Sequence, residues 1–121
     1  MKNAFLIMAL MTAGLSSHAQ NFDGSWTGKL KAGAQEFTIE AKVNQSKQDV
    51  SATIVNVGAP AVSLEVSFLS DDSISVAYSS LDIAYQGKRE GDVVKGVFVQ
   101  HGIRLPMELK RGEVTYNRPQ N

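Results

Sequence analysis

The residues that could carry catalysis or hold a metal are few, and none stands in a pattern that such chemistry requires. After residue 19 the single histidine is His101, in the turn-like pair His101-Gly102, and the chain has no cysteine. A zinc site takes several His, Cys or acidic ligands, and a Ser–His–Asp triad would have to use His101. No serine stands in the Gly-x-Ser-x-Gly pattern of a nucleophile elbow. We therefore expect His101 to be an exposed turn residue, with no metal and no catalytic residues.

The acidic residues fit turns and solvated strand faces better than binding sites. Calcium takes several oxygen ligands spaced along one loop, whereas Asp71-Asp72 are adjacent and Asp92 stands in a different turn-like segment. Asp82 and Glu108 alternate with apolar residues, so both are expected on the solvated faces of their strands. This placement argues against the paired carboxylates of a glycosidase.

The charge balance does not favour binding to nucleic acid. Lysines and arginines number 12, as do the acidic residues, and without Lys2 the basic side chains fall one short of the acidic ones. Lys88-Arg89 and Lys110-Arg111 are short basic pairs without a wider basic surface, so we interpret them as solvated edges. No glycine-rich phosphate loop follows a strand and opens a helix. We expect no cofactor and no nucleic-acid partner.

Residues 1–19 are typical of a cleavable export signal. Lys2 gives the positive end, Ala4–Leu15 forms an apolar run, and Ser17-His18-Ala19 resembles a cleavage site after Ala19. The run is shorter than the roughly 20 residues of a membrane span. An uncleaved N-terminal anchor is the alternative. The sequence predicts export to the periplasm or the exterior, without stable membrane insertion after cleavage.

Strict alternation of apolar and polar residues dominates the rest of the chain, as in the segment Phe37–Val43. Such alternation predicts antiparallel strands with one face on a core and one in water. Eight strands are predicted, at 25–31, 35–44, 48–56, 61–69, 73–79, 81–87, 93–100 and 103–110. Short turn-like connections should join sequential strands as hairpins. The expected fold is an all-β, eight-strand antiparallel up-and-down meander over 20–112, closed or nearly closed into a barrel, followed by a polar tail at 113–121. A half-open sheet or a small sandwich is the alternative.

Three strands pair an aromatic residue with a glycine two positions away, and therefore on the same face. The pairs are Trp26 with Gly28, Tyr85 with Gly87, and Phe98 with Gly96. An inward glycine leaves a gap that a neighbouring ring can cover and permits the sharp bend of a small barrel. We interpret these glycines as barrel corners covered by aromatic rings; stacking of the rings on a ligand is the functional alternative.

The segment Gly24-Ser25-Trp26, at the start of the predicted meander, resembles the G-x-W signature of the lipocalin and calycin group. The resemblance implies a lipocalin-like barrel with Trp26 at its closed end. It also implies a basic residue near the last strand that packs over the tryptophan. Arg111 has the matching position, and its cation–π contact with Trp26 would be modest.

The chain after residue 19 also resembles the small non-catalytic β domain that precedes the catalytic domain of some secreted bacterial α/β-hydrolases. The matching residues are Trp26, Gly28 and Leu30, then Tyr85 and Gly87, then Gly96, Phe98, Gln100, Gly102, Leu105, Pro106, Leu109 and Arg111. The segment 56–60 departs from the polar, glycine-containing loop with an acidic residue that is frequent in that family. The resemblance implies a stand-alone accessory or binding domain and gives no activity.

These patterns predict a core and a function. The predicted core is Trp26, Leu30, Phe37, Ile39, Val43, Leu64, Val66, Phe68, Val76, Tyr78, Ile83, Tyr85, Phe98, Leu105 and Leu109. The first hypothesis is a non-enzymatic binding protein with a small apolar or amphipathic ligand in the barrel mouth, lined by Phe37, Phe68, Tyr78 and Phe98. The alternative is an interaction module that docks on a secreted hydrolase or another envelope protein through a sheet face or a strand edge. A hydrolase with an acid–base pair inside the barrel ranks last.

Overall fold

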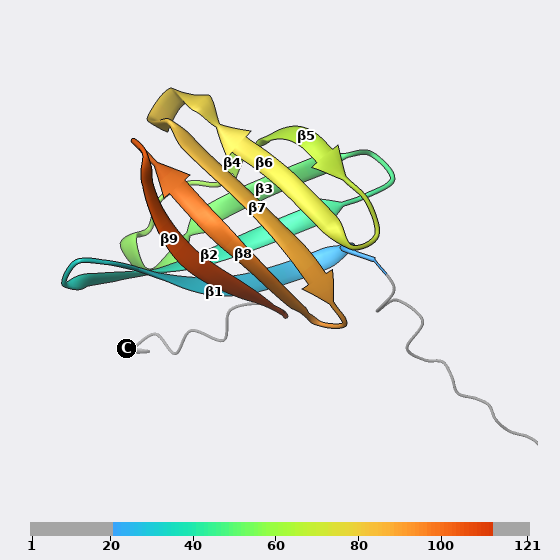
Figure 1. The fold of residues 1–121 in the computed structure, drawn as a ribbon, viewed down its shortest axis with the longest axis horizontal. Coiled ribbons are helices and arrows are strands. Elements are labelled where there is room, and N and C mark those ends of the chain that lie inside the picture. The colour runs from blue at the N-terminus through green and yellow to red at the C-terminus, as the bar shows by residue number, and fades with distance from the viewer. Residues whose placement is uncertain (1–20, 113–121) are drawn as a thin grey trace, which may run out of the picture.

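A computed structural model of the protein describes residues 21–112, which form one antiparallel sheet rolled into a barrel (Figure 1). Its nine strands are β1 (Gly24–Ala32), β2 (Gln35–Asn44), β3 (Asp49–Ile54), β4 (Val62–Ser63), β5 (Glu65–Leu69), β6 (Ser73–Tyr78), β7 (Ile83–Glu90), β8 (Val93–Gln100) and β9 (Ile103–Arg111). Two short 3-10 turns, η3 (Val55–Val57) and η4 (Ser79–Leu81), follow β3 and β6. The predicted export signal and the predicted tail at 113–121 lie outside the described residues. Within residues 21–112, no helix is long and apolar enough to cross a membrane.

The first and last strands close the barrel. Strand order in the sheet is β4-β3-β2-β1-β9-β8-β7-β6-β5, and every neighbouring pair is antiparallel. Strands β1 and β9 pair through Trp26 with Arg111, Thr27 with Lys110 and Gly28 with Leu109. Every chain neighbour is also a sheet neighbour except β4 and β5. The predicted up-and-down meander is therefore confirmed.

The gap that remains in the barrel lies between β4 and β5, within a segment predicted to be one strand. The segment predicted as a single strand at 61–69 bends at Leu64, which separates β4 from β5. Strand β4 pairs with β3 over two residues, and the Leu64 N–H donates to the Val50 carbonyl at 2.8 Å. Strand β5 then pairs with β6 on its other side. This bend makes nine strands out of the predicted eight and leaves the barrel nearly closed.

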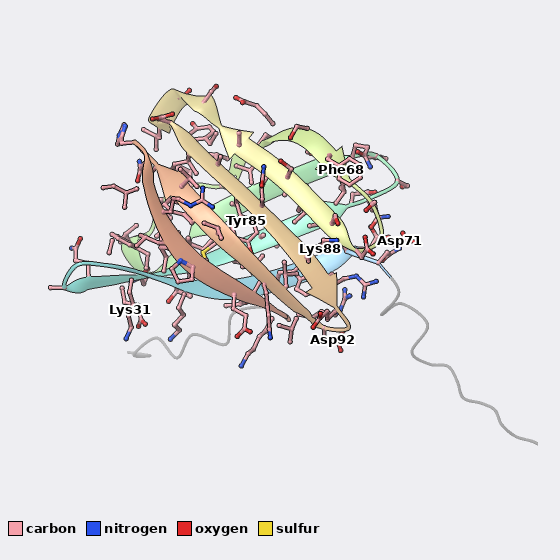
Figure 2. The ribbon with its side chains drawn as sticks, viewed as in Figure 1. Lys31, Phe68, Asp71, Tyr85, Lys88 and Asp92 are labelled. Carbon is pink, nitrogen blue, oxygen red and sulfur yellow. The ribbon has the colours of Figure 1, made fainter. Side chains whose placement is uncertain are left out.

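A β-bulge in β5 corrects the predicted position of Phe68. Val66 pairs with Val76 and Phe68 with Ser75, so Ser67 is the extra residue that shifts the register. One extra residue reverses which side chains face the core. Leu69 is consequently buried, while Phe68 is 55% exposed and lies on the outside of the barrel (Figure 2). The prediction that Phe68 belongs to the core is therefore wrong, and Phe68, also predicted as a ligand residue, does not line the cavity of the barrel.

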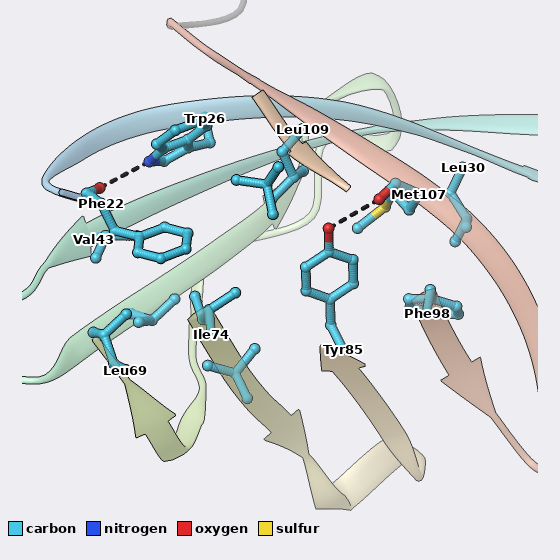
Figure 3. Packing of buried hydrophobic residues seen from close by; sticks show 13 residues of the cluster. Phe22, Trp26, Leu30, Val43, Leu69, Ile74, Tyr85, Phe98, Met107 and Leu109 are labelled. Carbon is cyan, nitrogen blue, oxygen red and sulfur yellow. Dashed lines mark hydrogen bonds between the residues drawn. The ribbon is translucent and has the colours of Figure 1, made fainter. Parts of the chain in front are cut away.

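Most of the other predicted core residues lie inside the barrel. Seven of them are buried, namely Trp26, Leu30, Val43, Val76, Tyr85, Phe98 and Leu109, and Phe37, Ile39, Leu64, Val66, Ile83 and Leu105 pack against them half-buried. Buried residues that the sequence prediction did not include are Phe22, Val50, Leu69, Ile74, Val94 and Met107 (Figure 3). Phe22 precedes the first strand, so alternation gave no signal for its burial.

The two ends of the barrel differ. At one end the chain enters through residues 21–23 and turns between β2 and β3, β5 and β6, and β7 and β8 (right in Figure 1). The other end carries the turns between β1 and β2, between β6 and β7 and between β8 and β9, together with the η3 segment (left in Figure 1). We call the first end, where the chain enters, the closed end, and the second end the mouth.

Candidate functional site

The interior of the barrel contains a cavity of about 550 Å³. Its lining is almost entirely apolar, and within the described part of the chain no Asp, Glu, Lys or Arg contributes to it. The lining comprises Leu30, Ala32, Phe37, Ile39, Ala41, Val50, Ala52, Thr53, Ile54, Ala59, Pro60, Val62, Leu64, Ile74, Val76, Tyr78, Leu81, Ile83, Tyr85, Phe98, Gln100, His101, Ile103, Leu105, Met107 and Leu109. Three of the four predicted ligand residues, Phe37, Tyr78 and Phe98, belong to it, and Phe68 does not.

Inward-facing residues of β6 to β9 form straight rows across the wall of the cavity. From the mouth inward the rows are Tyr78, Ile83, Gln100 and Ile103, then Val76, Tyr85, Phe98 and Leu105, then Ile74, Gly87, Gly96 and Met107. The first row contains the polar side chain of Gln100 and the hydroxyl of Tyr78. The two rows below it are apolar apart from the hydroxyl of Tyr85. Polarity in this wall is therefore concentrated at the mouth.

Tyr85 lies against the wall of the barrel over two glycines. A Cβ at Gly96 would collide with the Tyr85 ring and with the Gln86 carbonyl, and a Cβ at Gly87 would lie 3.1 Å from the Tyr85 hydroxyl. The glycines therefore leave the space that this ring occupies. In this position the Tyr85 hydroxyl donates to the Met107 carbonyl at 2.9 Å (Figure 3).

The prediction that aromatic rings cover these glycines holds for Gly87 and Gly96, which both lie under Tyr85, and fails for Gly28. Gly96 is covered by Tyr85 of the adjacent strand rather than by Phe98. The space beside Gly28 is filled by Leu109, whose Cδ2 would lie 2.5 Å from an added Cβ, and not by Trp26. At Gly96 and Gly28 the gap is filled by a cross-strand neighbour, because side chains of adjacent strands meet over the glycine.

Burial raises the pKa of the Tyr85 hydroxyl well above its usual value, and the negative charge of Glu108 raises it further. The Met107 carbonyl can accept a hydrogen bond only from the protonated hydroxyl. Tyr85 is therefore a neutral hydrogen-bond donor that fixes the wall at ordinary pH.

The closed end is sealed by Phe22, Trp26 and Arg111. The Trp26 indole N–H donates to the Phe22 carbonyl at 2.8 Å, and the two ring centroids are 5.8 Å apart (Figure 3). The Arg111 guanidinium carbon lies 4.3 Å from the Trp26 ring centroid. Both aromatic side chains are 1% exposed. Solvent therefore does not enter the barrel through this end.

The guanidinium of Arg111 ties the chain entry to the last strand. Its Nε lies 2.6 Å from Asp92 Oδ1, Nη1 donates to the Asp23 carbonyl at 2.7 Å, and Nη2 donates to the Asn21 carbonyl at 2.7 Å. Gly24, at a φ of +115°, provides the left-handed backbone that brings residues 21–23 under this side chain. Trp26 thus lies at the closed end with Arg111 over it, as the G-x-W resemblance implied.

Two titratable side chains, those of His101 and Asp82, lie close together at the mouth. His101 Nδ1 lies 3.3 Å from Asp82 Oδ2, and their side chains are 70% and 71% exposed. Among residues 21–112, no serine hydroxyl bonds to His101, and no group of three or more His, Cys, Asp or Glu could hold a metal. Leu81, predicted inside a strand at 81–87, instead ends η4 and is 53% exposed at the mouth.

Comparison with known proteins finds no family model, no curated protein and no solved structure that matches this chain. The resemblance to the accessory domain of secreted hydrolases stays a prediction.

Proposed function

We propose that the protein is an exported, non-enzymatic binding protein that holds one small apolar or amphipathic molecule inside its barrel. The observation that supports this proposal is the cavity of about 550 Å³. It is closed at one end, and mostly apolar residues line it as far as the mouth. Small-molecule sites in proteins typically measure about 300–1,000 Å³ and are mostly apolar with a few polar groups. The proposed export rests on the signal-like segment at residues 1–19.

The chemistry of the lining favours an apolar occupant over water. Ordered water in a cavity needs several polar partners, and apolar cavities stay dry. Below the mouth row, the wall of β6 to β9 offers only the Tyr85 hydroxyl, which is already donated to Met107. A hydrocarbon gains contacts there that water does not.

The free energy gained by burial requires a ligand with a hydrocarbon chain of moderate length. Each buried methylene contributes about 0.8 kcal/mol, while association costs at least about 4 kcal/mol of translational and rotational freedom. About twelve methylenes therefore give a net of about 6 kcal/mol, which corresponds to a dissociation constant of about 0.1 mM. Shorter chains bind more weakly unless their head group adds affinity.

The cavity extends from Leu109 near the closed end to Ile103 at the mouth. These residues are six positions apart on β9, which is about 20 Å along the strand, or about 15 Å along an axis tilted by about 40°. An extended chain advances about 1.2 Å per bond, as a polypeptide backbone does. A linear chain of about twelve carbons would therefore span the cavity.

The proposal is tested by native mass spectrometry of the protein purified from the cell that produces it. We expect an adduct of small-molecule mass that is lost on denaturation. The variant Ala52→Phe, which adds a ring inside the cavity, should lack the adduct. Ala84→Phe, which adds the same ring at a position outside the lining, should keep it. Wild-type protein that carries no adduct and binds no alkyl compound in solution would contradict the proposal.

A second candidate function is the interaction module, for docking on a partner hydrolase or another envelope protein. It is favoured by the edge of β5, which ends the sheet and pairs with no further strand within residues 21–112, and by the exposed Phe68 on that strand. A free edge can accept a strand from a partner by backbone pairing. Gln48 covers part of this edge, because its Nε2 donates to the Leu69 carbonyl at 3.3 Å. The cavity is the larger and more specific feature, so ligand binding ranks first.

A further inference from the structure

We infer that the ligand carries a neutral hydrogen-bond donor, such as an alcohol hydroxyl or an amide N–H, held at the mouth by Gln100 and Tyr78. This inference rests on the proposed function, because it specifies the ligand class of the same cavity. The apolar rows place the hydrocarbon deep in the barrel, and the polar groups of the first row place the head group at the mouth.

Gln100 presents an acceptor at the mouth. Its Nε2 donates to the Leu81 carbonyl at 3.1 Å, and this bond ties β8 to the η4 turn. A carbonyl can only accept, so the amide nitrogen must face Leu81 and the amide oxygen must face away from it. Within residues 21–112 the Gln100 Oε1 accepts no hydrogen bond. A ligand hydroxyl or amide N–H can supply the missing donor.

Tyr78 provides a second polar group in the same row. It lies two strands from Gln100, with Ile83 between them, at a separation of about 10 Å for two strand spacings. Tyr78 lines the cavity, and its hydroxyl makes no hydrogen bond within residues 21–112. A phenol hydroxyl both donates and accepts, so it can complete the bonding of an alcohol or amide head group.

Within the described chain, the cavity lining gives an ionised head group no Asp, Glu, Lys or Arg to pair with. A carboxylate is acceptor-only, and beside Gln100 Oε1 it would bring two acceptors together. An ammonium group would be partly desolvated without a lining carboxylate to pair with, which is costly.

Isothermal titration calorimetry with three alkyl compounds of equal chain length tests the inference. Decanol, undecanoate and decylammonium share the same decyl chain and differ only in the head group. We expect decanol to bind about tenfold more tightly than either ion. Tyr78→Phe and Gln100→Leu should each weaken decanol binding by about 2- to 10-fold, the usual effect of one neutral hydrogen bond.

The controls separate the head group from the fold. Gln86→Leu makes the same change as Gln100→Leu at an exposed position of β7 outside the cavity lining, and it should leave decanol binding unchanged. Tyr78→Phe keeps the ring, so it reports on the hydroxyl even if Gln100→Leu loosens the mouth. Binding of undecanoate or decylammonium as tight as that of decanol would overturn the inference and leave the proposed function standing. Failure of all three compounds to bind would instead overturn the proposed function.

Discussion

Arg111 and Trp26 are partners in two ways at once. They are opposite each other in the β1–β9 ladder that closes the barrel, and the guanidinium carbon of Arg111 lies 4.3 Å from the centroid of the Trp26 ring. The residues that close the sheet are therefore also the residues that seal its end. Because the cavity needs a sealed end to exclude water, closure of the sheet and formation of the ligand site depend on the same pair.

Replacement of Arg111 should destabilise the barrel strongly. Arg111→Met removes the bond to Asp92 and leaves the carbonyls of Asn21 and Asp23 without their donor, so we expect the free energy of unfolding to fall by about 2–4 kcal/mol. Arg111→Lys keeps the charge but not the planar fork, and should cost about 1–2 kcal/mol. Urea unfolding followed by Trp26 fluorescence measures both values.

The neighbouring variant Lys110→Met, at an exposed position of β9, serves as the control and should change the free energy of unfolding by less than about 0.5 kcal/mol. Equal losses for Arg111→Met and Lys110→Met would show that Arg111 does not seal the end.

Because of the bulge at Ser67, alanine substitutions at the adjacent residues Phe68 and Leu69 should change the free energy of unfolding by very different amounts. Phe68→Ala should change the free energy of unfolding by less than about 0.5 kcal/mol, because Phe68 is 55% exposed. Leu69→Ala should lower it by about 2–4 kcal/mol, because Leu69 is 8% exposed and packs in the core. Thermal and urea unfolding of the two variants checks this. The reverse order would place Phe68 inside and remove the bulge.

The same bulge explains which part of the site the sequence could not predict. Alternation alone placed Phe68 beside Val66 on the inner face, because a bulge leaves no mark in the apolar pattern. The η4 turn likewise moved Leu81 out of the predicted strand and to the mouth. Strand order and most of the core followed from alternation and short turns, whereas the cavity depends on the tertiary position of Tyr85 over Gly96.

Gly96→Ala should close part of the cavity and destabilise the fold. The added methyl group would meet the Tyr85 ring and the Gln86 carbonyl, so the ring must move off the wall. Overpacking of this kind costs about 1–3 kcal/mol. Differential scanning calorimetry gives the loss of stability, and titration with decanol gives the loss of binding. Lys95→Ala, on the exposed face of the same strand, is the control. Unchanged stability and binding in Gly96→Ala would show that the Tyr85 ring can move aside without loss of packing.

Tyr85 should make stability fall at alkaline pH. Its folded-state pKa is raised above the unfolded value of about 10. The protonated hydroxyl therefore stabilises the fold fully below about pH 10, and this contribution is lost as the pH rises above that value. Tyr85→Phe should be about 1–2 kcal/mol less stable at neutral pH, because the buried Met107 carbonyl loses its donor.

The difference between the wild-type protein and Tyr85→Phe should then shrink as the pH is raised above about 10, with a slope of up to about 1.4 kcal/mol per pH unit. Urea unfolding at a series of pH values measures it. A constant difference between the two proteins across this range would contradict the assignment.

The chain-length dependence of binding tests the central claim most directly. Calorimetric titration with linear alcohols should show affinity rising about fourfold per methylene, the equivalent of about 0.8 kcal/mol. The rise should level off at about twelve carbons, the chain length that the depth of the cavity allows. Ala52→Phe should level off at shorter chains, and Ala84→Phe should follow the wild-type protein. No dependence on chain length, or the same dependence in wild-type and Ala52→Phe protein, would contradict a ligand held inside the barrel.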